Sequence, residues 1–246
     1  MNVLVVDIGG TNVKMLATGR KEPRRFPSGP TLTPEQMVAG VKEVAADWKY
    51  DAVSIGYPGR VAGDRAVTEP RNLAQGWVGF DFAAAFGCPV KVINDAAMQA
   101  LGSYNGGTML FLGLGTGLGS ALVVRGHIVP MELGALPYGK KGTIEDHLGA
   151  RGLQTHGKKK WRKILGRLVA RFMSALLLDD FVIGGGNAKK LKTMPPGCRL
   201  GTNANAFIGG FRMWEPASVR MALASPSRVR ETASKKAERK TKGTRK

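Results

Sequence analysis

Two copies of one pattern, just over a hundred residues apart, constrain the fold of this chain most strongly. Each copy is an apolar strand-like run, a turn rich in glycine, and a second strand-like run. In order, the runs and turns are Val3–Val6, Asp7–Asn12 and Val13–Ala17, then Met109–Leu112, Gly113–Gly119 and Ser120–Val124. Because each turn joins two strands, both copies predict a β-hairpin and not the strand-to-helix turn of a P-loop or dinucleotide site. The duplication predicts two lobes with a cleft.

The glycines of these two turns, the first and second glycine turns, favour binding of phosphate groups. Without side chains in the way, backbone N–H groups can point inward and hold phosphate oxygens. The predicted phosphate-binding residues are Gly9, Gly10, Thr11 and Lys14 around the first turn and Gly115, Thr116 and Gly117 in the second. A lone turn of this kind is more often a plain tight turn, so the prediction depends on the pair.

A carboxylate stands at a strand end between the two hairpins. Val90–Ile93 is a predicted strand that delivers Asn94 and Asp95 to the head of a helix, Ala96–Tyr104. An Asp before a helix is usually an N-cap. Beside two phosphate-binding turns, Asp95 is the candidate general base for an acceptor hydroxyl, and Asn94 would orient a neighbouring hydroxyl. Asp7, at the end of the first strand, fits a Mg²⁺ ion held through water.

The remaining segments alternate helices and strands, which predicts an α/β layer architecture. A helix begins at Pro34, because Thr33 and Gln36 can form a capping box and Pro is favoured at the first helical position. Ala52–Tyr57 is the next strand, and Phe181–Ile183 is a later one that runs into a glycine turn. A last amphipathic helix is predicted from Ala204, Phe207, Ile208 and Phe211.

The clearest predicted helix is Trp161–Leu177, whose apolar residues recur at helical spacing. Its other face and the residues just before it carry cations, namely Lys158, Lys159, Lys160, Arg162, Lys163, Arg167 and Arg171. Such a face is commonly just solvated. Seven cations without an intervening acid are a stronger bias than solubility needs, which favours a long anionic partner.

Basic residues outnumber acidic ones, and the net charge is +19. Residues 216–246 contain ten Lys/Arg and two Glu, a net +8, which leaves +11 for the body. This tail is rich in Ser, Lys and Arg and is expected to be disordered. A solubilising extension is the simpler role. The alternative is an arm that binds polyphosphate, or binds nucleic acid without sequence specificity.

Composition limits the class of protein. With 246 residues and 43% hydrophobic content, the chain can bury the core of one large domain or of two lobes. No apolar run reaches the length of a membrane span and no secretion signal opens the chain, so no membrane partner is expected. Cys88 and Cys198 are isolated and lack metal-ligand spacing. A reduced, cytoplasmic setting is the expectation.

Short motifs spread over residues 2–215 agree with one known family. They are Asp7–Thr11, Pro58–Gly59, Asn72–Leu73 with Gly76–Trp77, Asn94–Ala96, Gly113–Gly119, Glu132–Gly134 and Gly184–Asn187. Together they resemble the ROK (Repressor, ORF, Kinase) sugar kinases. Further segments resemble the polyphosphate glucokinase branch, namely Leu136–Tyr138, Glu145–Asp146, Gly157–Lys163 and Gly184–Phe211.

This resemblance implies an α/β, two-lobe actin/hexokinase-like (ribonuclease H-like) ATPase fold with a cleft between the lobes. Residues 1–94 would form the N-terminal lobe and residues 95–202 the C-terminal lobe. Residues 203–215 would be a helix that returns to the N-terminal lobe, and residues 216–246 would be the tail. A homodimer is expected.

The resemblance also implies roles for site residues. The hexose would be bound by Asn72, Asn94, Asp95, Glu132 and Glu145. The turn on the nucleotide side would be Gly184, Gly185, Gly186 and Asn187. Ala135 stands where the family has a histidine, which removes one hydrogen bond to the sugar. The cysteine-rich zinc loop of many ROK proteins has no counterpart here, so no zinc is expected.

The expected function is Mg²⁺-dependent transfer of a phosphoryl group from inorganic polyphosphate, and from ATP, to the 6-hydroxyl of glucose or a related hexose. Polyphosphate would bind the basic cluster, defined as Lys158, Lys159, Lys160, Arg162 and Lys163. Two alternatives stay open. One is an ATP-dependent ROK hexose kinase of relaxed sugar specificity, and the other is a weakly active or non-catalytic protein that binds sugar or polyanions.

Overall fold

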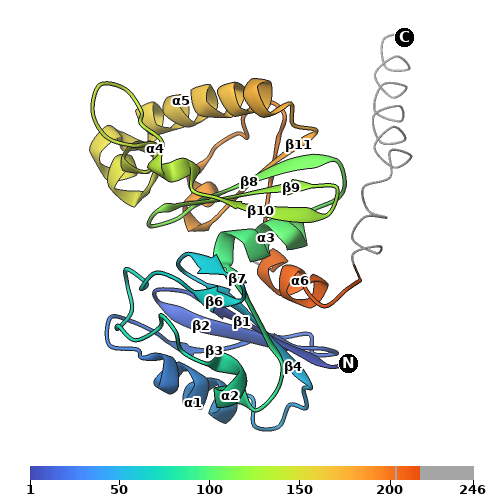
Figure 1. Cartoon of the computed structure of the whole chain (residues 1–246). Helices are drawn as coiled ribbons and strands as arrows, with labels where there is room; N and C mark the ends of the chain where they lie inside the picture. The colour runs from blue at the N-terminus through green and yellow to red at the C-terminus, as the bar shows by residue number, and fades with distance from the viewer. Residues whose placement is uncertain (203, 217–246) are drawn as a thin grey trace.

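The computed structural model describes residues 1–202 and 204–216, and it contains two five-stranded sheets of the same topology (Figure 1). The first sheet has the order β3-β2-β1-β4-β7 and the second the order β10-β9-β8-β11-β12. The first is built from β1 (Val3–Ile8), β2 (Asn12–Ala17), β3 (Arg24–Pro27), β4 (Ala52–Tyr57) and β7 (Val90–Asn94). The second is built from β8 (Thr108–Leu114), β9 (Leu118–Val124), β10 (His127–Met131), β11 (Asp180–Gly184) and β12 (Cys198–Leu200).

Helices cover and join these sheets. The α-helices are α1 (Pro34–Val44), α2 (Phe82–Phe86), α3 (Asp95–Ser103), α4 (Ile144–Leu148), α5 (Ala150–Leu176) and α6 (Asn205–Arg212). Two 3-10 turns, η1 (Leu133–Ala135) and η2 (Gly186–Lys190), and a small ribbon of β5 (Val61–Ala62) and β6 (Arg65–Ala66) complete the described part. No helix within it is long and apolar enough to span a bilayer. The predicted tail lies outside the described residues, apart from Pro216.

The duplicated hairpins are confirmed. In each sheet three strands form an antiparallel meander, and two further strands run parallel to the first of them. The predicted capping box of α1 is also confirmed, because the Thr33 side chain accepts from Gln36 N and the Gln36 side chain accepts from Thr33 N. The α/β architecture therefore follows the hydrophobic pattern of the sequence.

Helix α3 lies between the two sheets, with α6 beside it (Figure 1). Small residues make this packing possible. A Cβ on Gly102 would stand 1.8 Å from Asn205 O, and one on Gly209 would stand 1.8 Å from Met98 O. The two helices thus touch backbone to backbone. On its other side α6 meets β1, where a Cβ on Gly210 would stand 2.3 Å from a Val5 methyl.

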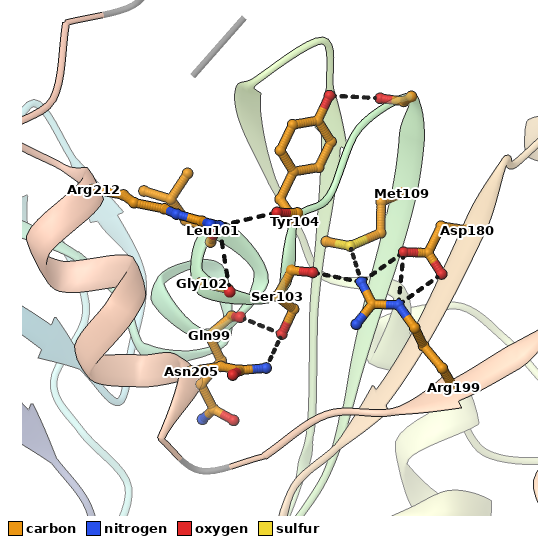
Figure 2. Close-up of polar contacts among 11 residues, drawn as sticks. Gln99, Leu101, Gly102, Ser103, Tyr104, Met109, Asp180, Arg199, Asn205 and Arg212 are labelled. Atoms are coloured by element: carbon orange, nitrogen blue, oxygen red, sulfur yellow. Dashed lines mark hydrogen bonds and ion pairs between the residues drawn. The ribbon is translucent and has the colours of Figure 1, made fainter. Parts of the chain in front are cut away.

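Two arginines fix the C-terminal end of α3, as Figure 2 shows. Arg212 of α6 donates to Leu101 O at 2.7 Å and to Tyr104 O at 2.9 Å. Arg199 of β12 donates to Ser103 O and pairs with Asp180 at 2.7 Å. The last carbonyls of a helix lack partners within the helix and carry partial negative charge, so both guanidinium groups stabilise this end. The position of α3 is thereby tied to both sheets.

The structure corrects two helix predictions. Helix α5 begins at Ala150 and is kinked at Gly157 (φ 66°, ψ 161°), well before the predicted start at Trp161. The first part of α5 buries little, so its sequence lacks the apolar period on which the prediction rested. In α6, Ile208 is exposed, because the buried face consists of Ala206, Phe207 and the two glycines that contact α3 and β1.

We expect Gly102→Ala to lower the free energy of unfolding by about 1–3 kcal/mol, because the added methyl must push α3 away from α6. The matched control is Gly166→Ala inside α5, where an added Cβ meets nothing within 4 Å. That variant should gain about 0.5–1 kcal/mol from helix propensity. Urea unfolding measures both. Equal effects of the two substitutions would contradict the close packing.

Candidate active site

A cleft of about 520 Å³ lies between the two sheets and is lined by both of them and by α3. Of the predicted site residues, its lining contains Gly9, Gly10, Asn72, Asn94, Asp95, Gly115, Thr116, Gly117, Glu132, Glu145 and Gly185. Within residues 1–202 and 204–216, the predicted residues outside this lining are Asp7, Thr11, Lys14, Gly184, Gly186, Asn187 and the basic cluster. Both glycine turns and the acidic residues therefore meet at one cavity.

Asp95 is the first residue of α3 and faces the cleft. Burial and the neighbouring Asp7 carboxylate raise its pKa to about 7, and a hydrogen bond from Ala96 N to Oδ1 (2.8 Å) opposes the rise. A carboxylate with a pKa near the working pH is well matched to general-base chemistry. The geometry thus gives Asp95 the electrostatic character that a proton acceptor needs.

Asn94 is the N-cap of α3. Its Oδ1 accepts from Ala96 N at 3.0 Å and from Ala97 N at 3.2 Å, and its Nδ2 donates to Gly59 O at 3.0 Å. The oxygen is therefore engaged with the helix, so an acceptor hydroxyl would meet the amide nitrogen. The same side chain also fixes the direction of α3 and hence of Asp95.

Asp7 ends β1 beside Lys14 of β2, and the Lys14 Nζ lies 4.0 Å from the Asp7 Oδ2. Burial raises the pKa of the Asp7 carboxyl, and Lys14 opposes this rise. The Asp7 carboxylate, which does not line the cleft, thus repels the Asp95 carboxylate, which does. A cation would relieve that repulsion.

Each glycine turn uses the N–H of one of its cleft-lining glycines to close itself. Gly9 N donates to Asn12 O at 3.0 Å, and Gly115 N donates to Gly117 O at 3.1 Å. The other N–H groups of the turns are therefore the candidates for phosphate oxygens. The Asn72 side chain lies over the first turn, with its Cβ 3.2 Å from the place of a Cβ on Gly10.

Glu145 in α4 lies against the second glycine turn. Its Oε2 accepts from Leu118 N at 3.0 Å, and its Oε1 accepts from Arg71 Nη1 at 2.7 Å. Both carboxylate oxygens thus have protein partners. Glu132, the other predicted sugar ligand of this sheet, is exposed at the cleft. Ala135 is exposed and does not line the cleft.

A chain of hydrogen bonds connects the second glycine turn to the basic cluster. Asn187 Nδ2 donates to Gly115 O at 2.8 Å, and Lys190 Nζ donates to Asn187 Oδ1 at 2.8 Å. Arg162 in turn donates through Nε to Lys190 O at 3.1 Å. Arg162 is therefore half-buried, whereas the four lysines of the cluster are exposed. The chain of hydrogen bonds thus joins one residue of the basic cluster, Arg162, to the second glycine turn.

The sequence did not identify Arg71 or Glu69, which also line the cleft. Glu69 accepts from Trp77 N at 3.1 Å and from Val78 N at 3.2 Å, so it shapes the loop that carries Asn72. Arg71 pairs with a residue 74 positions further along the chain. A local motif gives no signal for such a pair, and only its place beside Asn72 could have drawn attention to it.

The raised pKa of Asp95 predicts that Asp95→Asn stabilises the fold at pH 8. Between pH 3.8 and about 7 the folded state keeps a proton that the unfolded state loses, so wild-type stability falls as pH rises through this window. Asn has no such titration. The free energy of unfolding of Asp95→Asn should exceed that of the wild type by on the order of a few kcal/mol at pH 8, and the difference should shrink towards pH 4. Urea unfolding at both pH values measures it.

Asp146→Asn is the control of opposite sign. Hydrogen bonds from Thr143 hold the pKa of Asp146 below its usual value, so that carboxylate stabilises the fold at neutral pH and loses the effect as pH falls. Asp146→Asn should therefore destabilise at pH 8. If both variants, or neither of them, had a higher free energy of unfolding than the wild type at pH 8, the opposite pKa shifts of Asp95 and Asp146 would be contradicted.

Comparisons with known proteins show which sequences and structures this chain is similar to. A Brucella melitensis protein described as the bifunctional enzyme NanE/NanK is 33% identical over 141 residues, 52% of this chain. The chain spans 27% of that relative's length. A polyphosphate glucokinase of Mycobacterium tuberculosis is 26% identical over 212 residues, covering 78% of this chain and 80% of the relative.

The solved structure of an inorganic polyphosphate/ATP-glucomannokinase from Arthrobacter sp. strain KM has a TM-score of 0.71 and 26% identity. The match covers 90% of this chain and 98% of the glucomannokinase chain. The fold is thus the two-lobe actin/hexokinase-like fold, as the sequence predicted. A family model described as the ROK family matches residues 3–135, more than half of the chain. The chain belongs to the ROK family.

Proposed function

We propose that this protein is a sugar kinase that transfers a phosphoryl group from inorganic polyphosphate, with ATP as a second donor, to the 6-hydroxyl of glucose or a related hexose. The observation that carries the proposal is the position of Asp95, with its pKa of about 7, in a cleft that also contains both glycine turns. The polyphosphate and hexose kinases among its relatives support it. A cytoplasmic homodimer stays a prediction from the sequence.

In this proposal the chain's own residues orient the acceptor and accept its proton. The Asp95 carboxylate takes the proton from the 6-hydroxyl as that oxygen attacks the terminal phosphorus of the donor, and the bond from this phosphorus to the next bridging oxygen breaks. Asn72, Asn94 and Glu132 would hold the other hydroxyls of the sugar. Much of the rate in such a reaction comes from this placement.

The carboxylates at the end of β1 and the start of α3 fit a Mg²⁺ ion. Asp7 is a partly buried oxygen ligand with a raised pKa, and Mg²⁺ commonly takes one or two carboxylates while keeping waters and binding phosphate oxygens. When bound, Mg²⁺ would supply positive charge at the donor phosphates. Asp7 would hold it, and Lys14 would add a further positive charge beside it.

The choice of polyphosphate rests on the link between donor turn and basic cluster. Exposed Lys158, Lys159, Lys160 and Lys163 follow the kink at Gly157 in α5. The start of α5 is anchored on the second glycine turn, because Ala150 N donates to Thr116 O at 3.1 Å. A polyanion leaving that turn could therefore run along the lysines and release counterions there.

ATP is included as a donor because of the turn after β11. Gly185 lines the cleft, and Asn187 is hydrogen-bonded to Gly115 of the second glycine turn. This places a glycine-rich backbone beside the phosphate-binding turn, where a nucleoside could extend from its phosphates. Neither donor needs the basic cluster to reach Asp95, but polyphosphate is long enough to use it.

Asp95→Asn should abolish phosphorylation, lowering kcat by about 10²–10⁴-fold, because the acceptor proton loses its base. Hexose binding, measured by calorimetry, should persist. In the wild type kcat/KM should rise with pH and level off above about pH 7, when the carboxylate is ionised. A folded Asp95→Asn protein with near wild-type turnover would refute the role of this residue.

Replacing Lys159, Lys160 and Lys163 together by Gln should raise the KM for long polyphosphate by about tenfold or more at low salt, and raise the KM for ATP far less. Arg162 is left intact, because its guanidinium holds Lys190 O. The control replaces three exposed cations near the first sheet, Lys21, Lys49 and Arg65. Equal changes in the KM for polyphosphate and for ATP would show that the basic cluster is only a solvated surface and does not bind polyphosphate.

A further inference from the structure

An ion pair crosses the cleft and joins its two sides. Arg71 belongs to the loop after β6, and Leu73 in the same loop is buried in the core of the first sheet. Glu145 lies on α4, whose Ile144 and Leu148 are buried in the core of the second sheet. The Arg71 Nη1 lies 2.7 Å from the Glu145 Oε1. The pair therefore links two separately packed cores at the cavity itself.

This pair is part of a series of contacts between the two glycine turns. On one side, Asn72 next to Arg71 lies over Gly10 of the first turn. On the other side, Glu145 uses its second oxygen to accept from Leu118 N at 3.0 Å, directly after the second turn. A Cβ on Gly117 would stand 2.6 Å from that oxygen. Moving Arg71 would therefore affect the carboxylate that supports the second turn.

The solvent exposure of Arg71 and Glu145 determines how strong their ion pair is. The Arg71 side chain is 83% exposed and that of Glu145 is 31% exposed. Ion pairs this exposed contribute little to stability and are screened by salt. The pair is thus too weak to keep the cleft shut, but it can bias the arrangement of Glu145 whenever the two sides approach.

We propose that Arg71 is a positioning residue that acts as a reversible latch: with the cleft closed it fixes Glu145, and through Glu145 the second glycine turn. The effect of Arg71 on catalysis rests on the proposed function, whereas its effect on the position of the second glycine turn does not. Arg71 touches no reacting atom in this scheme. It acts through Glu145, which accepts a hydrogen bond from Leu118 N and lines the cleft.

The first test needs no substrate. Amide hydrogen exchange at Leu118 is measured in the wild type, in Arg71→Ala and in a control, Arg151→Ala. Arg151 forms the neighbouring ion pair with Asp146, whose side chains are 77% and 34% exposed, but both partners lie on the second sheet's side. Arg71→Ala should speed exchange at Leu118 by about fivefold or more, because Glu145 loses an anchor. Arg151→Ala should not.

The second test is steady-state kinetics with a hexose and ATP. Arg71→Ala should lower kcat about tenfold with little change in the KM for ATP, since the turn is misplaced and not removed. Arg71→Lys, which can still reach one carboxylate oxygen, should restore much of the rate. Salt should reduce kcat in the wild type more than in Arg71→Ala.

The two tests separate the latch from the proposed function. Unchanged exchange at Leu118 in Arg71→Ala would overturn the latch even in an active enzyme. Faster exchange at Leu118 in Arg71→Ala, found together with a wild-type protein that phosphorylates no hexose, would uphold the latch and refute the proposed function. Faster exchange with unchanged kcat and unchanged salt response would overturn the positioning role in catalysis.

Discussion

Backbone contact between α3 and α6 is the constraint on which the rest of the structure depends. Glycines at the crossing let α3 lie between two sheets while α6 fits against β1, so one helix can touch both halves of the molecule. The arginines at its C-terminal end come from α6 and from β12. Since α3 begins with Asp95, this packing holds the carboxylate in the cleft that both glycine turns line.

The same packing explains why the site is electrostatically strained. Fixing α3 in the interior brings Asp95 close to Asp7 and removes water from both, which raises both pKa values. Two carboxylates so arranged reduce stability at neutral pH, and structure elsewhere must compensate for them. The capping of α3 by Asn94 and the two arginines at its other end supply fixed contacts of that kind.

The sequence predicted much of this fold, since hairpins, capping box and strand–helix alternation leave local patterns. It did not predict β3, β10, β12, α2 or α4, short elements with too few residues to show a period, nor the first part of α5. At the site, motif residues such as Gly10 and Asp95 were recognised by their local turns. Arg71 was missed because its partner is 74 positions away and the two meet only in the folded chain.

The second glycine turn is where the two substrates of the proposed reaction would influence each other. Glu145 supports it from α4, Asn187 from the turn after β11, and Ala150 from the start of the helix that carries the lysines. The first turn is held by Ser28, whose hydroxyl donates to Gly9 O at 2.6 Å and whose N–H donates to Thr11 O at 3.0 Å, and the Asn72 side chain lies over Gly10. In the proposed reaction, a change in either substrate would reach the second turn through these partners. Because Glu145 also pairs with Arg71, such a change would reach the opposite side of the cleft through two side chains, without rearrangement of either core.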